Sequence, residues 1–137
     1  MITIAYYSMT GKVEKFVNNL YYPHVLDITT ESNIATPFVL ITSTVNFGEI
    51  PAPVQFFMKN NYKHCLGISG SGNKNWGSNY CNATNLLAKQ YNIPIINKFE
   101  LSGTEQDVVI FKNRLNIINK LVSSNATQDV LAFRKSK

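Results

Sequence analysis

Residues 2–13 read ITIAYYSMTGKV and decide the fold. The first part, Ile2 to Tyr7, is a short apolar run rich in β-branched and aromatic residues, which is typical of a buried strand. Polar residues from Ser8 to Gly11 interrupt that run. Apolar residues then recur with the period of about 3.6 that marks one face of a helix, namely Val13, Phe16, Val17, Leu20 and Tyr21. The stretch therefore predicts a strand, a polar turn and a helix in direct succession.

The same succession recurs along the rest of the chain. Apolar runs predict further strands at 24–28, 38–41, 65–68 and 95–101, and helical spacing predicts helices that start near Pro51, near Tyr80 and after Thr104. Residues 104–107 resemble a capping box with an aspartate in the acidic position. Short apolar strands separated by helices predict a parallel sheet covered on both faces. We expect a three-layer α/β sandwich with five parallel strands in the flavodoxin-like order 2-1-3-4-5.

Length and composition predict one folded domain. The chain has 137 residues, of which 45% are hydrophobic and 15% charged, which is a globular composition. No apolar run reaches the roughly 18 residues that a membrane span needs, and the N-terminal segment lacks the features of a signal peptide. We expect a cytoplasmic protein that does not bind membranes, with a domain at 1–122 and a polar, partly basic tail at 123–137.

The net charge of +5 is concentrated at the C-terminal end, where Arg134, Lys135 and Lys137 lie. Without these three the chain has ten basic and eight acidic residues, a net charge of +2. A nucleic-acid-binding protein is expected to carry a basic stripe on a folded face, and the sequence shows none. We therefore expect no nucleic-acid partner and a solvated chain end.

The cysteines and histidines offer no metal or catalytic site. Cys65 and Cys81 match no zinc or redox spacing, and their apolar surroundings predict free thiols in a reducing compartment. His24 and His64 have no companion at ligand spacing. We assign no catalytic side chain and no metal ligand.

Ligands of parallel α/β sheets bind at the carboxyl ends of the strands, which here lead into the loops 8–12, 42–48 and 69–77. The first loop ends at a helix N-terminus, whose free N–H groups and dipole favour a phosphate. The same residues would also serve as an ordinary helix cap at Thr10, with no ligand. Because a Walker motif is incomplete here, a nucleoside triphosphate is disfavoured.

The second and third loops carry aromatic residues, Phe47 beside Gly48 and Trp76 beside Gly77. Each can lie against a flat ring, and each can instead pack into the core. Asn46 tolerates the left-handed conformation, so the backbone there can switch between two peptide orientations. A phosphate cradle between two aromatic loops fits FMN, whereas a dinucleotide would prefer Gly-x-Gly-x-x-Gly after the first strand.

These segments resemble NrdI, the flavodoxin-like protein that accompanies class Ib ribonucleotide reductase. The resemblance runs from residue 1 to about 122 and rests on YSMTG at 7–11, NFGEIP at 46–51, GSGNKNWG at 70–77 and the segment 94–108. It implies a non-covalently bound FMN that a flavodoxin-type or NAD(P)H-linked protein reduces. The reduced flavin would react with dioxygen, giving an oxidant such as superoxide. This oxidant would pass to the dimanganese site of the small reductase subunit, NrdF, and generate its tyrosyl radical.

The resemblance also implies which residues hold the cofactor. The phosphate would lie on Ser8, Met9, Thr10, Gly11, Lys12 and Val13. The isoalloxazine would lie among Thr42, Ser43, Thr44, Asn46, Phe47, Gly48, Ser71, Gly72, Asn73, Trp76 and Gly77. Lys12 stands where the family usually has asparagine, and Asn46 stands where some members have glycine, so a backbone switch at flavin N5 is expected to involve more strain.

The predicted cleft is less acidic than that of an electron-transfer flavodoxin. Lys12 and Lys74 stand against Glu49, and nearby positive charge favours an anionic ligand state. We therefore expect the flavin semiquinone to be less strongly favoured than in a typical flavodoxin. Partner contacts are expected around the cleft, at Phe47, Glu49, Asn75 and Trp76.

Two other functions fit the same pattern. A short-chain flavodoxin that carries electrons between reductases would share the FMN but prefer acidic surfaces for its partners. A module without flavin would keep the fold and use the three loops only for packing.

Overall fold

A computed structural model describes residues 1–124, and the basic chain end that the sequence singles out lies outside them. The described chain forms one five-stranded sheet in the order β2-β1-β3-β4-β5, with all strand pairs parallel. This confirms the predicted order. The strands are β1 (Thr3–Tyr7), β2 (Val25–Asp27), β3 (Phe38–Thr42), β4 (Cys65–Gly72) and β5 (Ile95–Glu100). The helices are α1 (Lys12–Leu20), α2 (Ala52–Asn61), α3 (Asn82–Tyr91) and α4 (Glu105–Ser124), with the short 3-10 helices η1 (Tyr62–His64) and η2 (Lys74–Asn79).

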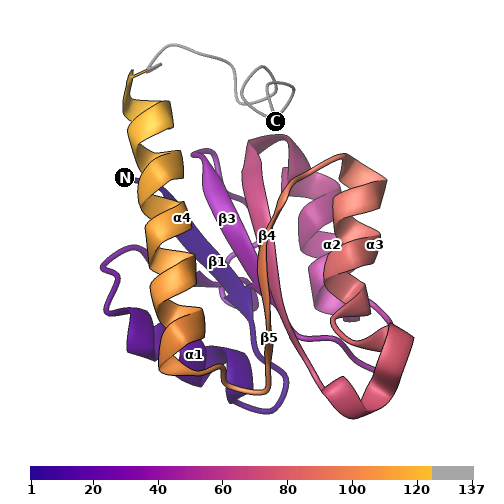
Figure 1. The fold of residues 1–137 in the computed structure, drawn as a ribbon. Coiled ribbons are helices and arrows are strands. Elements are labelled where there is room, and N and C mark those ends of the chain that lie inside the picture. The colour runs from indigo at the N-terminus through magenta and orange to yellow at the C-terminus, as the bar shows by residue number, and fades with distance from the viewer. Residues whose placement is uncertain (125–137) are drawn as a thin grey trace.

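Helices cover both faces of the sheet, α1 and α4 on one and α2 and α3 on the other (Figure 1). Helix α1 buries four of the five apolar residues that predicted it, Val13, Phe16, Val17 and Leu20, whereas Tyr21 follows the helix and is 88% exposed. Every residue of the central strand β3 is buried, as a strand between two helical layers requires. The predicted capping box also forms, because the Thr104 N–H donates to Asp107 Oδ2 over 2.8 Å and the Asp107 N–H donates to Thr104 Oγ1 over 3.2 Å.

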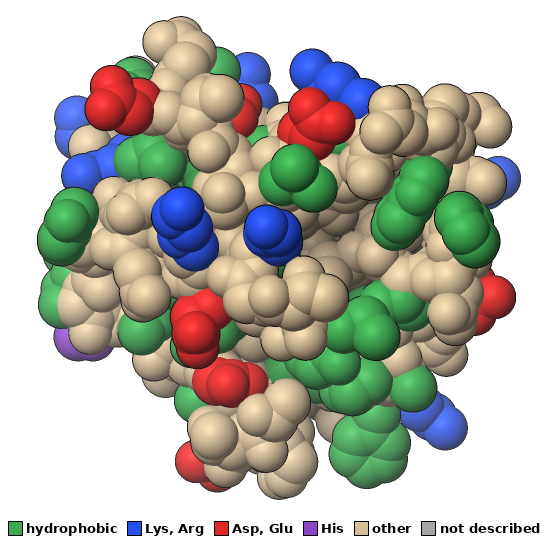
Figure 2. Space-filling model, turned by 90° about the horizontal axis from the view of Figure 1, so that it is seen from below, with side chains coloured by type: hydrophobic (Ala, Val, Ile, Leu, Met, Phe, Trp, Pro, Cys, Tyr) green, Lys and Arg blue, Asp and Glu red, His purple; other side chains and the backbone are tan. Residues whose placement is uncertain are grey.

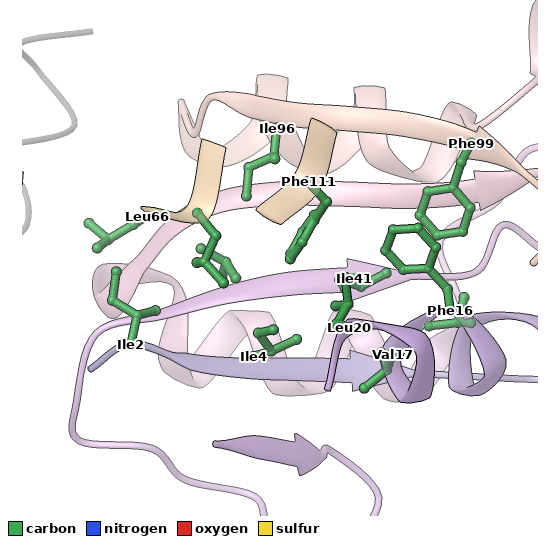
Figure 3. Packing of buried hydrophobic residues seen from close by; sticks show 13 residues of the cluster. Ile2, Ile4, Phe16, Val17, Leu20, Ile41, Leu66, Ile96, Phe99 and Phe111 are labelled. Carbon is green, nitrogen blue, oxygen red and sulfur yellow. The ribbon is translucent and has the colours of Figure 1, made fainter. Parts of the chain in front are cut away.

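Aromatic packing joins α1 to the end of β5 (Figure 3). The rings of Phe16 and Phe99 stack with centroids 3.9 Å apart, and Phe111 of α4 meets Phe16 edge-on at 5.8 Å. Gly103, in the turn after β5, lies against this stack, because a Cβ there would come within 2.7 Å of Phe16 Cδ1. The turn between β5 and α4 is thus fixed on the core.

The N-terminal end of the chain is tied to the C-terminal half of α4. The Ile2 N–H donates to Asn119 Oδ1 over 2.9 Å, and the Tyr22 hydroxyl donates to the Ile2 carbonyl. This tie lies at the amino end of the strands, away from the loops that follow them (Figure 1). Among the described residues, every helix is too short or too polar to cross a membrane.

The structure corrects two predicted boundaries. Strand β4 continues to Gly72, although we expected it to end at Ile68 with Ser69 already in a loop. Residues 69–72 all pair with β5, and Ser69 and Gly70 pair with β3 as well, so tertiary pairing outweighs their weak strand propensity. Helix α3 begins at Asn82, which leaves Tyr80 outside it. Both cysteines are buried thiols outside any disulfide, as predicted.

Candidate functional site

A cavity of about 280 Å³ lies at the carboxyl ends of β1, β3 and β4 and is open to solvent. This volume is near the lower limit, about 300 Å³, of small-molecule sites. Figure 2 views this end of the molecule, where hydrophobic side chains lie beside both basic and acidic ones. The residues that line the cavity are Met9, Thr10, Lys12, Ser43, Thr44, Val45, Asn46, Ser71, Gly72, Asn73, Trp76 and Leu101.

A larger cavity of about 460 Å³ lies between α2 and α3. Its lining includes the helix side chains of Gln55, Lys59 and Gln90 and the first residue of α2, Ala52, but no strand end. Size alone therefore does not identify the site. The strand-end cavity is the candidate because it lies beside the first turn of α1, at the carboxyl ends of the strands where ligands of parallel α/β sheets bind.

The first arm of the site is the turn from β1 into α1. The residue before the helix is Gly11, with φ 91°, and no side chain caps the helix from that position. The Ser8 hydroxyl instead accepts a hydrogen bond from the Glu14 N–H over 3.0 Å. The alternative of an ordinary cap at Thr10 is therefore wrong. The N–H groups of Lys12 and Val13 have no acceptor within the helix, and the space beside Gly11 is open, since a Cβ there would meet nothing within 4 Å.

The second arm, 42–48, ends in a tight turn. The Gly48 N–H donates to the Val45 carbonyl over 3.0 Å, and Asn46 and Phe47 between them have φ 48° and 60°, as in a type I′ turn. The left-handed conformation expected at Asn46 is confirmed and extends to Phe47. The Phe47 side chain is 69% exposed, so its packing into the core is excluded. Its ring meets that of Trp76 edge-on at 5.6 Å.

Hydrogen bonds hold the second arm to the first arm and to α3. The Ser43 hydroxyl donates to the Tyr7 carbonyl and accepts from the Met9 N–H, both over 3.3 Å. On the other side, the Asn82 amide donates to the Gly48 carbonyl over 2.9 Å. The arms around the cavity therefore form one connected unit.

The third arm is the end of β4 and the 3-10 helix η2. The Asn73 side chain accepts from the Asn75 N–H over 2.9 Å, and the Lys74 N–H donates to Glu100 Oε2 over 3.1 Å. Trp76 is half-buried in the cavity wall. Glu100 is thus a carboxylate near the site in addition to Glu49. It offsets part of the positive charge that Lys12 and Lys74 bring there.

Cys81 lies directly behind the third arm and is fully buried. Its Sγ is 3.4 Å from the Gly70 carbonyl oxygen. Burial raises the pKa of the Cys81 thiol to about 11. The thiol is therefore neutral at physiological pH and unreactive as a nucleophile, which assigns it to packing.

The cavity brings together most of the residues that the sequence predicted to bind a cofactor. Those on its wall are Met9, Thr10, Lys12, Ser43, Thr44, Asn46, Ser71, Gly72, Asn73 and Trp76. Ser8, Gly11, Val13, Thr42, Phe47, Gly48 and Gly77 lie outside the wall, and the side chains of Val13 and Thr42 are fully buried. These two side chains therefore cannot contact a ligand in the cavity. The structure adds two residues that the sequence analysis missed, Val45 and Leu101.

The donor set fits a phosphorylated ring. Lys12 and the free N–H groups of the first turn of α1 offer positive charge and hydrogen-bond donors to a phosphate. The rest of the wall carries the apolar side chains of Met9, Val45, Trp76 and Leu101, which suit a flat aromatic ring. The strand order and this site at the strand ends define a flavodoxin-like protein.

Comparisons with known proteins agree with this class. The chain is similar in structure to oxidised flavodoxin 2 from Bacillus cereus, with a TM-score of 0.65, 18% identity, and 87% of this chain and 98% of that chain covered. It is similar to a short-chain flavodoxin associated with a non-canonical PDU bacterial microcompartment, with a TM-score of 0.60, 18% identity and coverage of 88% and 99%. A flavodoxin from Streptococcus pneumonia TIGR4 matches with a TM-score of 0.58, 20% identity and coverage of 82% and 93%.

A family comparison is more specific. Residues 4–113 match the family described as NrdI Flavodoxin like. The chain belongs to this NrdI flavodoxin-like family, as the sequence resemblance indicated.

Proposed function

We propose that this protein binds FMN non-covalently in the strand-end cavity. Lys12 and the N–H groups of Lys12 and Val13 hold the phosphate, since the Ser8 hydroxyl takes the Glu14 N–H and leaves the two preceding N–H groups of the helix available. Trp76 and the turn 45–48, with the backbone around Asn46, would hold the isoalloxazine. The flavin supplies the redox chemistry with dioxygen, and the protein supplies position and electrostatics.

We further propose that the protein activates class Ib ribonucleotide reductase. A flavodoxin-type or NAD(P)H-linked protein reduces the flavin, and the oxidant formed from dioxygen passes to the dimanganese site of NrdF. We place this role in the cytoplasm, because two buried thiols outside any disulfide suit a reducing compartment. The protein acts as an accessory to the reductase rather than as an independent enzyme.

The observation that carries this proposal is the position of Phe47 beside the cavity. A bulky residue with positive φ is strained, yet the turn holds Phe47 in that conformation, 69% exposed. Its ring contacts Trp76 of the cavity wall. Such an exposed aromatic residue, with Glu49 two positions further along the chain and Asn75 next to its contact Trp76, is typical of a protein-binding surface.

The test combines cofactor binding with activation of the partner. FMN added to the cofactor-free protein is expected to bind and shift its visible absorption, and the reduced holoprotein is expected to reoxidise rapidly in air. NrdF loaded with Mn²⁺ should then form its tyrosyl radical, seen by electron paramagnetic resonance, only when the reduced holoprotein and dioxygen are both present. A protein that stays colourless after FMN is added would refute the proposal. Slow reoxidation with no radical would instead assign the protein to electron-carrying flavodoxins.

A pair of matched variants tests the proposed surface. Phe47→Ala should weaken NrdF binding in a pull-down or titration. Phe56→Ala should not, because Phe56 is 64% exposed on α2 and does not line the strand-end cavity. Equal effects of the two changes would refute the role of Phe47.

A further inference from the structure

The turn between β5 and α4 reaches the same cavity. It belongs to the segment KFELSGT at 98–104, to which the proposed function assigns no role. Within it, Leu101 lines the cavity, and its side chain is 43% exposed. Its φ is 55°, in the left-handed region that a leucine rarely adopts.

Hydrogen bonds on both sides impose this conformation. The Leu101 N–H donates to the Gly72 carbonyl over 3.0 Å, and its carbonyl accepts from the Ser71 hydroxyl. The Gly103 N–H closes the turn on the Glu100 carbonyl over 2.9 Å, while Gly103 itself packs on Phe16. The end of β4, which carries part of the third arm, therefore fixes Leu101 directly.

The side chain at 101 is not the one that the turn alone would favour. Glycine adopts positive φ without strain, and the chain uses glycine at Gly11 and Gly77, two other positive-φ positions beside the site. At Leu101 the chain instead places a strained, partly exposed apolar side chain on the cavity wall. Strained residues that the surrounding structure holds in place are concentrated at functional sites.

We propose that Leu101 contacts the ring of the bound flavin, so that the β5–α4 turn forms a fourth arm of the site. This inference rests on the proposed FMN site. It assigns Leu101 to the apolar wall around the isoalloxazine and leaves the phosphate to the first arm. Leu101 therefore determines how tightly the ring is held, with no part in phosphate recognition.

Two variants separate the ring contact from the backbone strain. Leu101→Gly removes the side chain and relieves the strain, whereas Leu101→Ala removes most of the side chain and keeps the strained backbone. The control is Tyr21→Gly, because Tyr21 also has positive φ, at 49°, and is exposed at the far end of α1. The measurements are the Kd values for FMN and riboflavin and the urea midpoint of the cofactor-free protein.

We expect both Leu101 variants to bind FMN about tenfold more weakly, as for one lost ring contact of about 1.4 kcal/mol. The Kd for riboflavin should rise by the same factor, because riboflavin lacks only the phosphate. Leu101→Gly and Tyr21→Gly should both raise the urea midpoint, and Tyr21→Gly should leave the FMN affinity unchanged.

Several results would overturn the inference while the FMN site itself stands. One is that the wild-type protein binds FMN and that both Leu101 variants bind it with the same Kd. A second is a loss for FMN alone, which would assign Leu101 to the phosphate end. A third is a loss in Leu101→Ala only, which would make the effect a consequence of backbone strain. Failure of the wild-type protein to bind FMN would refute the proposed function as well.

Discussion

Replacing Gly70 by alanine should destabilise the sheet directly beneath the cavity. A Cβ at Gly70 would overlap Thr84 Oγ1 and lie 3.0 Å from Thr84 Cβ and 3.4 Å from the Thr42 carbonyl oxygen. Thr84 is fully buried in α3, and a branched helix side chain has few rotamers into which it can move. Helix α3 or β4 must therefore shift. Overpacking of this kind costs about 1–3 kcal/mol, and more where the surroundings are rigid. We therefore expect Gly70→Ala to lower the free energy of unfolding by about 3 kcal/mol.

The companion change Thr84→Ala shows whether this contact is the cause. The Thr84 hydroxyl is buried without a hydrogen-bond partner among the described residues. Removing it alone should change the free energy of unfolding by less than about 1 kcal/mol, because the gain from no longer burying an unpaired hydroxyl offsets the cost of a small cavity. In the double variant the hydroxyl overlap is gone, and about 1–2 kcal/mol of the Gly70→Ala loss should be recovered, as is usual for residues in contact.

The assay is urea unfolding of the cofactor-free protein, followed by tryptophan fluorescence and circular dichroism. The control is Gly67→Ala, since a Cβ there would lie 2.8 Å from Ile96 Cγ1 and Cδ1 and 3.7 Å from the Pro94 carbonyl oxygen, a milder overlap than the one with Thr84 Oγ1. Gly67→Ala should lower the free energy of unfolding clearly less than Gly70→Ala does. The reasoning fails if Gly70→Ala lies within about 0.5 kcal/mol of the wild type, or if Thr84→Ala adds to the loss instead of reducing it.

Three further predictions concern the site. Trp76→Ala should weaken FMN binding by about 1–3 kcal/mol, the usual size of a lost aromatic contact, and an unchanged Kd would limit Trp76 to packing. Lys12→Ala should weaken FMN by about 1 kcal/mol at low salt and leave riboflavin unchanged, whereas equal losses for the two ligands would place Lys12 away from the phosphate. Because burial raises the pKa of the Cys81 thiol from 9.0 to about 11, its contribution to stability is full below pH 9 and is lost as the pH rises towards 11. Between about pH 8 and about pH 10.5 the free energy of unfolding of the wild type should therefore fall by about 2 kcal/mol more than that of Cys81→Ala, and equal losses would contradict this.

Periodicity predicted the fold because both faces of this sheet are buried. In β3 every residue is apolar or buried, and in α1 the apolar residues lie on one stripe, so hydrophobic burial decides both elements. Where a strand lacks hydrophobic side chains, the boundary predicted from the sequence was wrong. Residues 69–72 are serine and glycine, and they extend β4 because all four pair with β5 and the first two also pair with β3.

The same reason explains which site residues were found. The loops after β1, β3 and β4 are recognisable because glycine, asparagine and hydroxyl residues mark strand ends before a helix. Leu101 carries no such signal, since nothing in its identity indicates a left-handed backbone. Its conformation depends on hydrogen bonds with Ser71 and Gly72, which are brought near only by the folded sheet. Ser43 likewise reveals its link to Met9 only in three dimensions.

The tie between Ile2 and Asn119 has a practical consequence for binding experiments. Because it anchors the chain start at the amino end of the strands, a tether attached at Met1, whose side chain is 79% exposed, points away from the cavity. Protein immobilised through its N-terminus on a sensor chip should therefore present the mouth of the site to the flowing solution, free for both a small ligand and a large protein to approach.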